Sequence, residues 1–241
     1  MQTKTLDFIP IKTRIVNPPK DEIFDIIDNL EIHDGDIVFI TSKILGIHQG
    51  RCVPIEGNDK IELIKQEATH YKRYHNPLGS DMNLTITDNI LICASGIDES
   101  NANGHYIMWP KETDKLCREI RERLCKRTGV KRLGVISTDS ASTPLRWGVL
   151  GITTGLSGVA PLKDIRGHED LFGRKMKMAR INQIDPLTGM AVLIMGEAAE
   201  QTPILILRGH DGIEFDENGS REDMKISPEE DFFRPMLDVL K

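Results

Sequence analysis

Four short apolar runs constrain most strongly what this chain can fold into. They are five or six residues long and rich in Ile, Val and Leu: DIVFI at 36–40, NILICA at 89–94, LGVIST at 133–138 and PILIL at 203–207. Runs of this length and continuity are typical of strands that are buried on both faces. Segments with helical spacing separate them. The sequence therefore predicts an α/β protein of mixed α+β type, with mixed sheets.

The spacing of apolar residues predicts helices over 20–31, 60–69 and 113–128. The last of these is the clearest, because Leu or Ile recurs every fourth residue. Thr113 can cap its start and Gly129 follows its end.

A further helix is expected to open at Asp185-Pro186, with Asp as the cap and Pro at the first helical position. Its body, LTGMAVLIM, is apolar on nearly every face, so we expect it to be buried between layers. Residues 70–88 are polar and irregular, and we expect a loop with an edge strand there.

Length and charge limit the class of protein. The chain has 241 residues and a formal charge of −6, and 241 residues suffice for one large domain or two small ones. Residues 211–231 hold nine acidic and two basic side chains, so the rest of the chain is close to neutral. A neutral body argues against nucleic acid as a partner. We expect the acidic segment to be mobile over 215–224, with an amphipathic end that docks.

The sequence favours a cytoplasmic protein that does not span a membrane. The N-terminal residues contain no apolar signal-like run. The longest uncharged stretch, 147–162, has sixteen residues and is broken by four glycines. The four cysteines show no CxxC pairing and no metal-ligand spacing, so buried, reduced thiols are expected.

Polar residues follow the apolar runs where ligand-binding groups gather in α/β proteins. These are Ser42, Lys43, Asp98, Asn101, Asp139 and Ser140, with Glu197 after the apolar helix. Singly, each is explained by a turn or a helix cap. Together they suggest an oxygen-rich site for Mg²⁺ or Mn²⁺ beside phosphate. Neither GxxxxGK[ST] nor GxGxxG occurs. The glycine-rich stretch GITTGLSG at 151–158 indicates close backbone packing or, alternatively, a ligand-contacting loop.

Several segments, in this order, resemble the coenzyme F-420:L-glutamate ligases. They are FIPI at 8–11, TSK at 41–43, SGIDESNA at 95–102, TDS…PLRWG at 138–148, KDIRGHEDLFGR at 163–174 and MGE…P…LRG at 195–209. The likeness covers residues 8–212. It implies one catalytic domain over 1–212, with two intertwined subdomains as an alternative, before an acidic extension over 213–241. A branch of this family assigned to folate metabolism is an alternative placement.

The resemblance implies a GTP- or ATP-dependent, metal-dependent γ-glutamyl ligase and a homodimer. Its small-molecule substrates would be L-glutamate, the nucleotide and a carboxylate acceptor. The metal ligands would be Asp98, Asp139, Ser140 and Glu197. The nucleotide would contact Ile9, Pro10, Ile11, Ser42, Lys43, Asn101, Met195, Gly196 and Ala198.

This chemistry suits the residue types present. Hydroxide is a poor leaving group, so a carboxylate must first become an acyl phosphate before an amine can attack it. Arg146 and Arg166 are candidate catalytic clamps for carboxylate or phosphate. A structural ion pair between Arg166 and Asp164 is an equally good interpretation.

Three positions depart from the family's pattern. Thr143 stands where the family usually has Arg, Ile47 where it has Lys, and Pro186 where it has an acidic residue. The loss of two cations leaves two alternatives open, a non-catalytic nucleotide- or coenzyme-binding homologue and a different carboxylate–amine ligase or kinase on the same scaffold. The retained carboxylates favour catalysis on a changed acceptor.

Overall fold

A twisted five-stranded sheet forms the centre of the computed structural model, which describes residues 5–76 and 79–238. The strands lie in the order β1 (Asp7–Ile11), β12 (Ile204–Arg208), β2 (Asp36–Thr41), β8 (Leu133–Ser142) and β9 (Val149–Ser157). Neighbouring strands are antiparallel except β2 and β8, which run parallel. The mixed α/β fold predicted from the sequence is confirmed.

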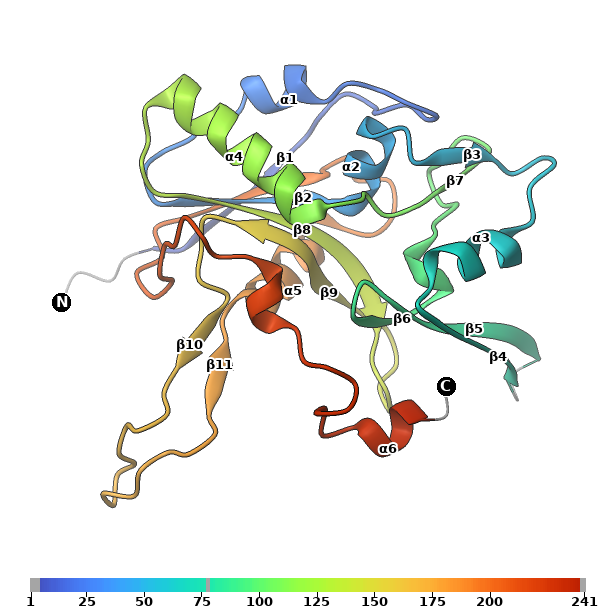
Figure 1. Cartoon of the computed structure of the whole chain (residues 1–241). Helices are drawn as coiled ribbons and strands as arrows, with labels where there is room; N and C mark the ends of the chain where they lie inside the picture. The colour runs from blue at the N-terminus through green and yellow to red at the C-terminus, as the bar shows by residue number, and fades with distance from the viewer. Residues whose placement is uncertain (1–4, 77–78, 239–241) are drawn as a thin grey trace.

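Helices cover both faces of this sheet (Figure 1). One face packs against α1 (Phe24–Asp28), α2 (Ser42–His48) and α4 (Thr113–Thr128). The other packs against α5 (Ile184–Met195). Side chains alternate along β2, so that Val38 and Ile40 enter the first core while Ile37 and Phe39 enter the second. The run DIVFI therefore has no polar face, because β2 is covered by packed side chains on both faces of the sheet.

Three smaller sheets extend the central one. The first consists of β4 (His70–Asn76), β5 (Ser80–Thr87) and β6 (Ile90–Cys93), beside α3 (Lys60–Glu67). The second pairs β3 (Cys52–Pro54) with β7 (His105–Ile107), and the third pairs β10 (Leu162–Asp164) with β11 (Arg180–Asn182). The last described helix is α6 (Arg234–Leu237).

Several predicted elements need correction. Within 70–88, residues 70–76 and 80–87 form the antiparallel strands β4 and β5 rather than a loop with an edge strand. NILICA forms β6 in this small sheet, where it is only partly buried. The helix expected over 20–31 spans only Phe24–Asp28, since the Glu22 carboxylate accepts the N–H groups of Ile23 and Phe24 ahead of it.

The helix ends also differ in detail. Thr113 is already helical and donates its hydroxyl to the Pro110 carbonyl, while Glu112 holds the N-cap position in a left-handed conformation. Asp185 lies inside the first turn of α5, whose leading N–H groups are accepted by Asn182. Gly129 ends α4 as expected, and Gly196 ends α5.

The helix α5 is not buried on all sides. Leu193 is 74% exposed and Met190 is also exposed, because no element covers this side of the helix in the described part of the chain. The glycine-rich stretch is confirmed as close packing within β9. A Cβ atom at Gly151 would lie 2.5 Å from the Thr188 carbonyl oxygen of α5, and one at Gly155 would meet Thr113 of α4.

The acidic C-terminal segment is packed against the body, so its predicted mobility over 215–224 is wrong. Phe215 and Met224 join the second core, and Arg221 is buried with its guanidinium on Asp88. In the described part of the predicted amphipathic end, Phe232, Phe233 and Met236 are exposed rather than docked, and Leu240 lies outside the described residues. The four cysteines are free thiols, but only Cys52 and Cys117 are fully buried.

Candidate functional site

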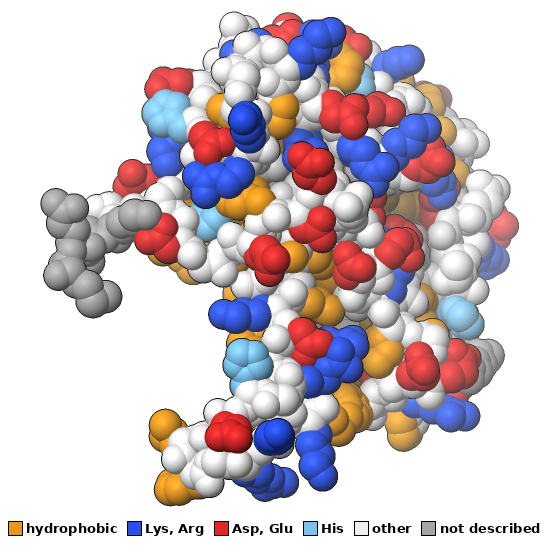
Figure 2. All heavy atoms as spheres, turned by 60° about the vertical axis from the view of Figure 1, so that its left-hand side comes forward, with side chains coloured by type: hydrophobic (Ala, Val, Ile, Leu, Met, Phe, Trp, Pro, Cys, Tyr) orange, Lys and Arg blue, Asp and Glu red, His pale blue; other side chains and the backbone are white. Residues whose placement is uncertain are grey.

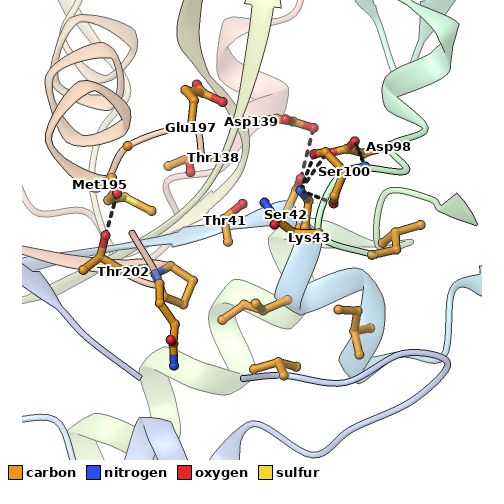
Figure 3. A pocket seen from close by; sticks show the side chains of 18 of the residues that line it. Thr41, Ser42, Lys43, Asp98, Ser100, Thr138, Asp139, Met195, Glu197 and Thr202 are labelled. Carbon is orange, nitrogen blue, oxygen red and sulfur yellow. Dashed lines mark hydrogen bonds and ion pairs between the residues drawn. The ribbon is translucent and has the colours of Figure 1, made fainter. Parts of the chain in front are cut away.

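One cavity of about 510 Å³ opens where β2 and β8 end their shared register. Thr41 and Thr138 are the last paired residues of the two parallel strands. The next residues are therefore neighbours, and the Ser42 hydroxyl donates to Oδ2 of Asp139 at 3.0 Å (Figure 3). Two chain segments 97 residues apart thus meet at the cavity wall.

Asp139 lies inside β8 rather than beyond its end, because β9 pairs with the strand as far as Ser142. Its Oδ2 accepts hydrogen bonds from the Ser42 hydroxyl and the Trp109 indole, and its Oδ1 accepts the N–H of Ser140 at 2.7 Å. Burial nevertheless dominates and raises the pKa of this carboxyl above its ordinary value. A cation in the cavity would favour the ionised form.

Asp98 enters the cavity from the loop after β6. Its backbone is fixed by reciprocal hydrogen bonds with Ile107 of β7. Ser100 donates its N–H to one carboxylate oxygen at 2.7 Å and its hydroxyl to the other at 3.0 Å. Lys43, in the first turn of α2, lies 2.7 Å from the same carboxylate. Burial alone would raise the pKa of Asp98, but the Lys43 ammonium and Ser100 lower it below its usual value.

Glu197 reaches the cavity from the loop that follows α5. Gly196 turns the chain out of the helix with a φ of 84°, a conformation that favours glycine. Burial raises the pKa of Glu197, and the negative charges of Asp139 and Asp98 add to this effect. The Asn101 amide donates to the Ala198 carbonyl at 2.7 Å and so ties this loop to the Asp98 loop.

The donor set fits a hard divalent cation. Asp98, Asp139, Glu197 and Ser140 all line one cavity, and their carboxylate and hydroxyl oxygens are the kind of ligand that Mg²⁺ and Mn²⁺ prefer. Burial raises the pKa values of Asp139 and Glu197, and a bound cation would favour the ionised form of both carboxyls. Within the described ranges, however, no three His, Cys, Asp or Glu side chains come close enough to grip one ion. The three carboxylates therefore line the same cavity but do not form a close cluster of metal ligands.

The structure brings most of the predicted site residues to this cavity. Ten of them line it: Ser42, Lys43, Asp98, Asn101, Asp139, Ser140, Met195, Gly196, Glu197 and Ala198. Their assigned roles as ligands of metal or nucleotide stay predictions. Ile9, Pro10 and Ile11 are not in the lining, because they form β1, where Ile9 and Ile11 pack against the core.

The two arginines expected to be catalytic lie elsewhere. Arg166 pairs with Asp164 at the end of β10, which confirms the structural interpretation of that residue. Arg146 lies in the turn between β8 and β9, where it donates to the Leu145 carbonyl at 3.1 Å. Neither lines the cavity in this chain. A catalytic role for them would require a rearrangement or a second subunit.

Sequence reasoning missed Trp109 and Ser100. Trp109 lines the cavity and packs with Ile92 and Ala141 while its indole N–H reaches Asp139. Only the scarcity of tryptophan, two in the chain, could have drawn attention to it. Ser100 lies inside the quoted motif SGIDESNA, and its position two residues after Asp98 is that of an Asx turn. Residues 13–16 also line the cavity, just beyond the predicted FIPI segment.

The fold and the site together define an α+β protein with an oxygen-rich cavity at the meeting of two parallel strands. Comparison with known proteins gives the family. The model of the F420-0:Gamma-glutamyl ligase family matches residues 10–209. The chain therefore belongs to this family of γ-glutamyl ligases.

Curated relatives agree with this placement. A coenzyme F420:L-glutamate ligase of Methanocaldococcus jannaschii is 36% identical over 87% of this chain and 89% of its own length. Enzymes of the same name from Methanopyrus kandleri and Methanococcus maripaludis strain C6 are 33% and 39% identical, again over 87% of this chain and over 88% and 89% of their own lengths. In the described part of the chain, every helix is too short or too polar to cross a membrane.

Proposed function

We propose that this ligase uses a nucleoside triphosphate and a divalent metal to join L-glutamate to a carboxylate acceptor through an acyl phosphate. The observation that carries the proposal is that Asp98, Asp139 and Glu197 line the same cavity as Lys43 and Ser42. The names of the relatives supply L-glutamate as one substrate and coenzyme F420 as the acceptor.

Two steps account for the bonds made and broken. An oxygen of the acceptor carboxylate attacks the γ-phosphorus, and the nucleoside diphosphate leaves with the bond electrons. The glutamate amine then attacks the acyl carbon, loses a proton and expels inorganic phosphate. Positioning and charge neutralisation supply most of the catalysis of phosphoryl transfer.

The residues have distinct tasks in this scheme. Asp98, Asp139, Ser140 and Glu197 would hold Mg²⁺ or Mn²⁺, which when bound neutralises phosphate charge. Ser42, Lys43 and Asn101 would contact the phosphate chain as donors. Thr143 and Ile47 stand where the family usually has two cations, which would contact the acceptor or the nucleotide base. We therefore propose that the preference for acceptor or nucleotide differs from that of typical members. An acceptor of the folate class is the alternative to a deazaflavin.

The experiment is a reaction of the protein with GTP or ATP, Mn²⁺, L-glutamate and a panel of deazaflavin and folate acceptors. Phosphate release with a mass gain of one glutamyl residue on an acceptor is the expected result. Nucleotide binding with no turnover on any acceptor would contradict the proposal and favour the non-catalytic alternative. Phosphate release without the glutamyl mass would favour another ligase or kinase.

We also propose that the active form is a homodimer. The β10–β11 hairpin extends away from the body and ends in exposed apolar side chains (Figure 2). The turn between β8 and β9 exposes two more. These four side chains are at least 92% exposed: Leu145, Trp147, Leu171 and Phe172. Apolar groups displayed on projecting loops are typical of surfaces that a second subunit covers.

A further inference from the structure

The ammonium of Lys43 lies in the cavity beside Asp98, one of the residues proposed to bind the metal ion. Its ammonium lies 2.7 Å from Oδ2 of Asp98, and it donates to the Ser100 carbonyl at 2.9 Å and to the Ser100 hydroxyl at 3.1 Å. All three contacts are to oxygen atoms. An ammonium so placed uses the same carboxylate oxygen that a metal ion would need.

Lys43 is also the cation in the lining that pairs with a single carboxylate, that of Asp98. The other one, Arg14, is fixed by both Asp21 and Asp25. Lys43 stands in the first turn of α2, with a flexible four-carbon side chain that is 24% exposed. One turn on, Ile47 is buried and apolar, so this face of α2 offers no second charge. An incoming phosphate chain would therefore attract Lys43 first.

We propose that Lys43 masks Asp98 in the free enzyme and is drawn away by the phosphates of the nucleotide, so that metal and nucleotide bind with positive coupling. The inference rests on the proposed use of metal and nucleotide. A monovalent ammonium and a divalent ion repel each other in a half-buried cavity, where water screens charge weakly. In the described ranges no three His, Cys, Asp or Glu side chains form a metal cluster, so under this proposal the metal site is completed only when nucleotide binds.

The test measures Mn²⁺ binding from the electron paramagnetic resonance of the free ion, with and without a non-hydrolysable GTP or ATP analogue. In the unmodified protein we expect the analogue to tighten Mn²⁺ binding at least tenfold. Lys43→Met should bind Mn²⁺ alone at least fivefold more tightly than the unmodified protein does. The same variant should bind the analogue alone more weakly, because the phosphates lose their cation. A merely structural defect would weaken both.

Lys60→Met is the matched control. Lys60 lies 3.4 Å from Glu99, the residue next to Asp98, and has a similar exposure of 29%, but it does not line the cavity. We expect its Mn²⁺ and nucleotide affinities to match those of the unmodified protein. Lys43→Gln is a second neutral variant, and thermal melting of each variant verifies folding.

The outcomes separate this inference from the proposed function. If the unmodified protein binds Mn²⁺ with the analogue but both Lys43 variants bind Mn²⁺ alone no better, the masking role is overturned and the ligase proposal stands. If the unmodified protein binds no Mn²⁺ even with the GTP and ATP analogues, the proposed metal use fails, and the inference fails with it.

Discussion

Asp139 shows how one residue of the site is held by an adjacent residue together with groups distant in sequence. Ser42, Trp109 and Ser140 each donate a hydrogen bond to it, yet burial keeps its pKa raised. The sequence motif indicated the carboxylate and its neighbour Ser140. The indole could not be predicted, because its contact depends on where the Trp109 segment packs against β8.

The raised pKa gives a pH prediction for stability. A carboxyl whose pKa is higher in the folded state binds more protons when folded, so the free energy of unfolding falls as pH rises through the interval between the two pKa values. Asp139→Asn removes this titration. Chemical denaturation between pH 4 and pH 8, without metal, should show the unmodified protein losing stability relative to the variant, with a slope of at most about 1.4 kcal/mol per pH unit. A constant difference across this range would contradict the assignment.

The same residue and Asp98 give a binding prediction. Asp98→Asn and Asp139→Asn should each weaken nucleotide binding in the presence of Mn²⁺ at least tenfold, about 1.4 kcal/mol. Without metal the loss should be much smaller, since the carboxylates would act through the cation. Isothermal titration calorimetry under both conditions measures this. Equal losses with and without Mn²⁺ would indicate a folding defect instead.

At the scale of elements, the site depends on the close approach of α2 to the chain segment after β7. A Cβ atom at Gly46 would lie 2.4 Å from the Met108 carbonyl oxygen. That neighbour is backbone, so the helix that carries Ser42 and Lys43 would have to shift.

Gly46→Ala should therefore destabilise the protein by about 1–3 kcal/mol, the usual cost of overpacking, and should also weaken nucleotide binding. Gly189→Ala is the matched control within α5, where the nearest atom to a new Cβ lies 3.9 Å away. Removing the backbone freedom of that helical glycine should stabilise the protein by about 0.5–1 kcal/mol. Thermal melts of both variants test the pair, and a stable Gly46→Ala variant would refute the packing argument.

Elements with a strong periodic pattern of apolar residues could be predicted from the sequence. Elements that depend on pairing with another strand could not. The helix over 113–128 and the four apolar runs appear at or near their predicted bounds. Polar side chains in both strands obscured the pairing of β4 with β5, although only β4 is largely exposed and Thr85, Ile86 and Thr87 of β5 are buried. The extension of β8 through Asp139 depends on pairing with β9, which no local pattern records.

At the scale of the whole molecule, the C-terminal segment and the projecting loops were the least predictable parts. Composition predicted mobility for the acidic segment, but burial of Arg221 and its pairing with Asp88 fix it in place. The resemblance implied a dimer, and the exposed apolar tip formed by Leu171 and Phe172 gives this expectation a surface to test.

Replacing both tip residues, Leu171→Ser with Phe172→Ser, should weaken self-association at least tenfold, about 1.4 kcal/mol. The melting temperature of the monomer should not fall, because both side chains are more than 90% exposed. Phe232→Ser, an 82% exposed site near the C-terminus, is the control that should leave association unchanged. Sedimentation velocity over a range of concentrations measures the result. A double variant that associates as strongly as the unmodified protein would exclude the hairpin tip.

The strand order of the central sheet has a consequence for how the protein is made. In the described sheet, β1 pairs with β12 alone, and β12 lies between the two earliest strands. A nascent chain that has not yet released residue 208 from the ribosome therefore has an amino-terminal strand without its partner and a gap beside β2. Glu197 also leaves the ribosome only shortly before that strand. The ligand cavity is thus completed only after residue 208 has left the ribosome, and we expect products truncated before β12 to lack it.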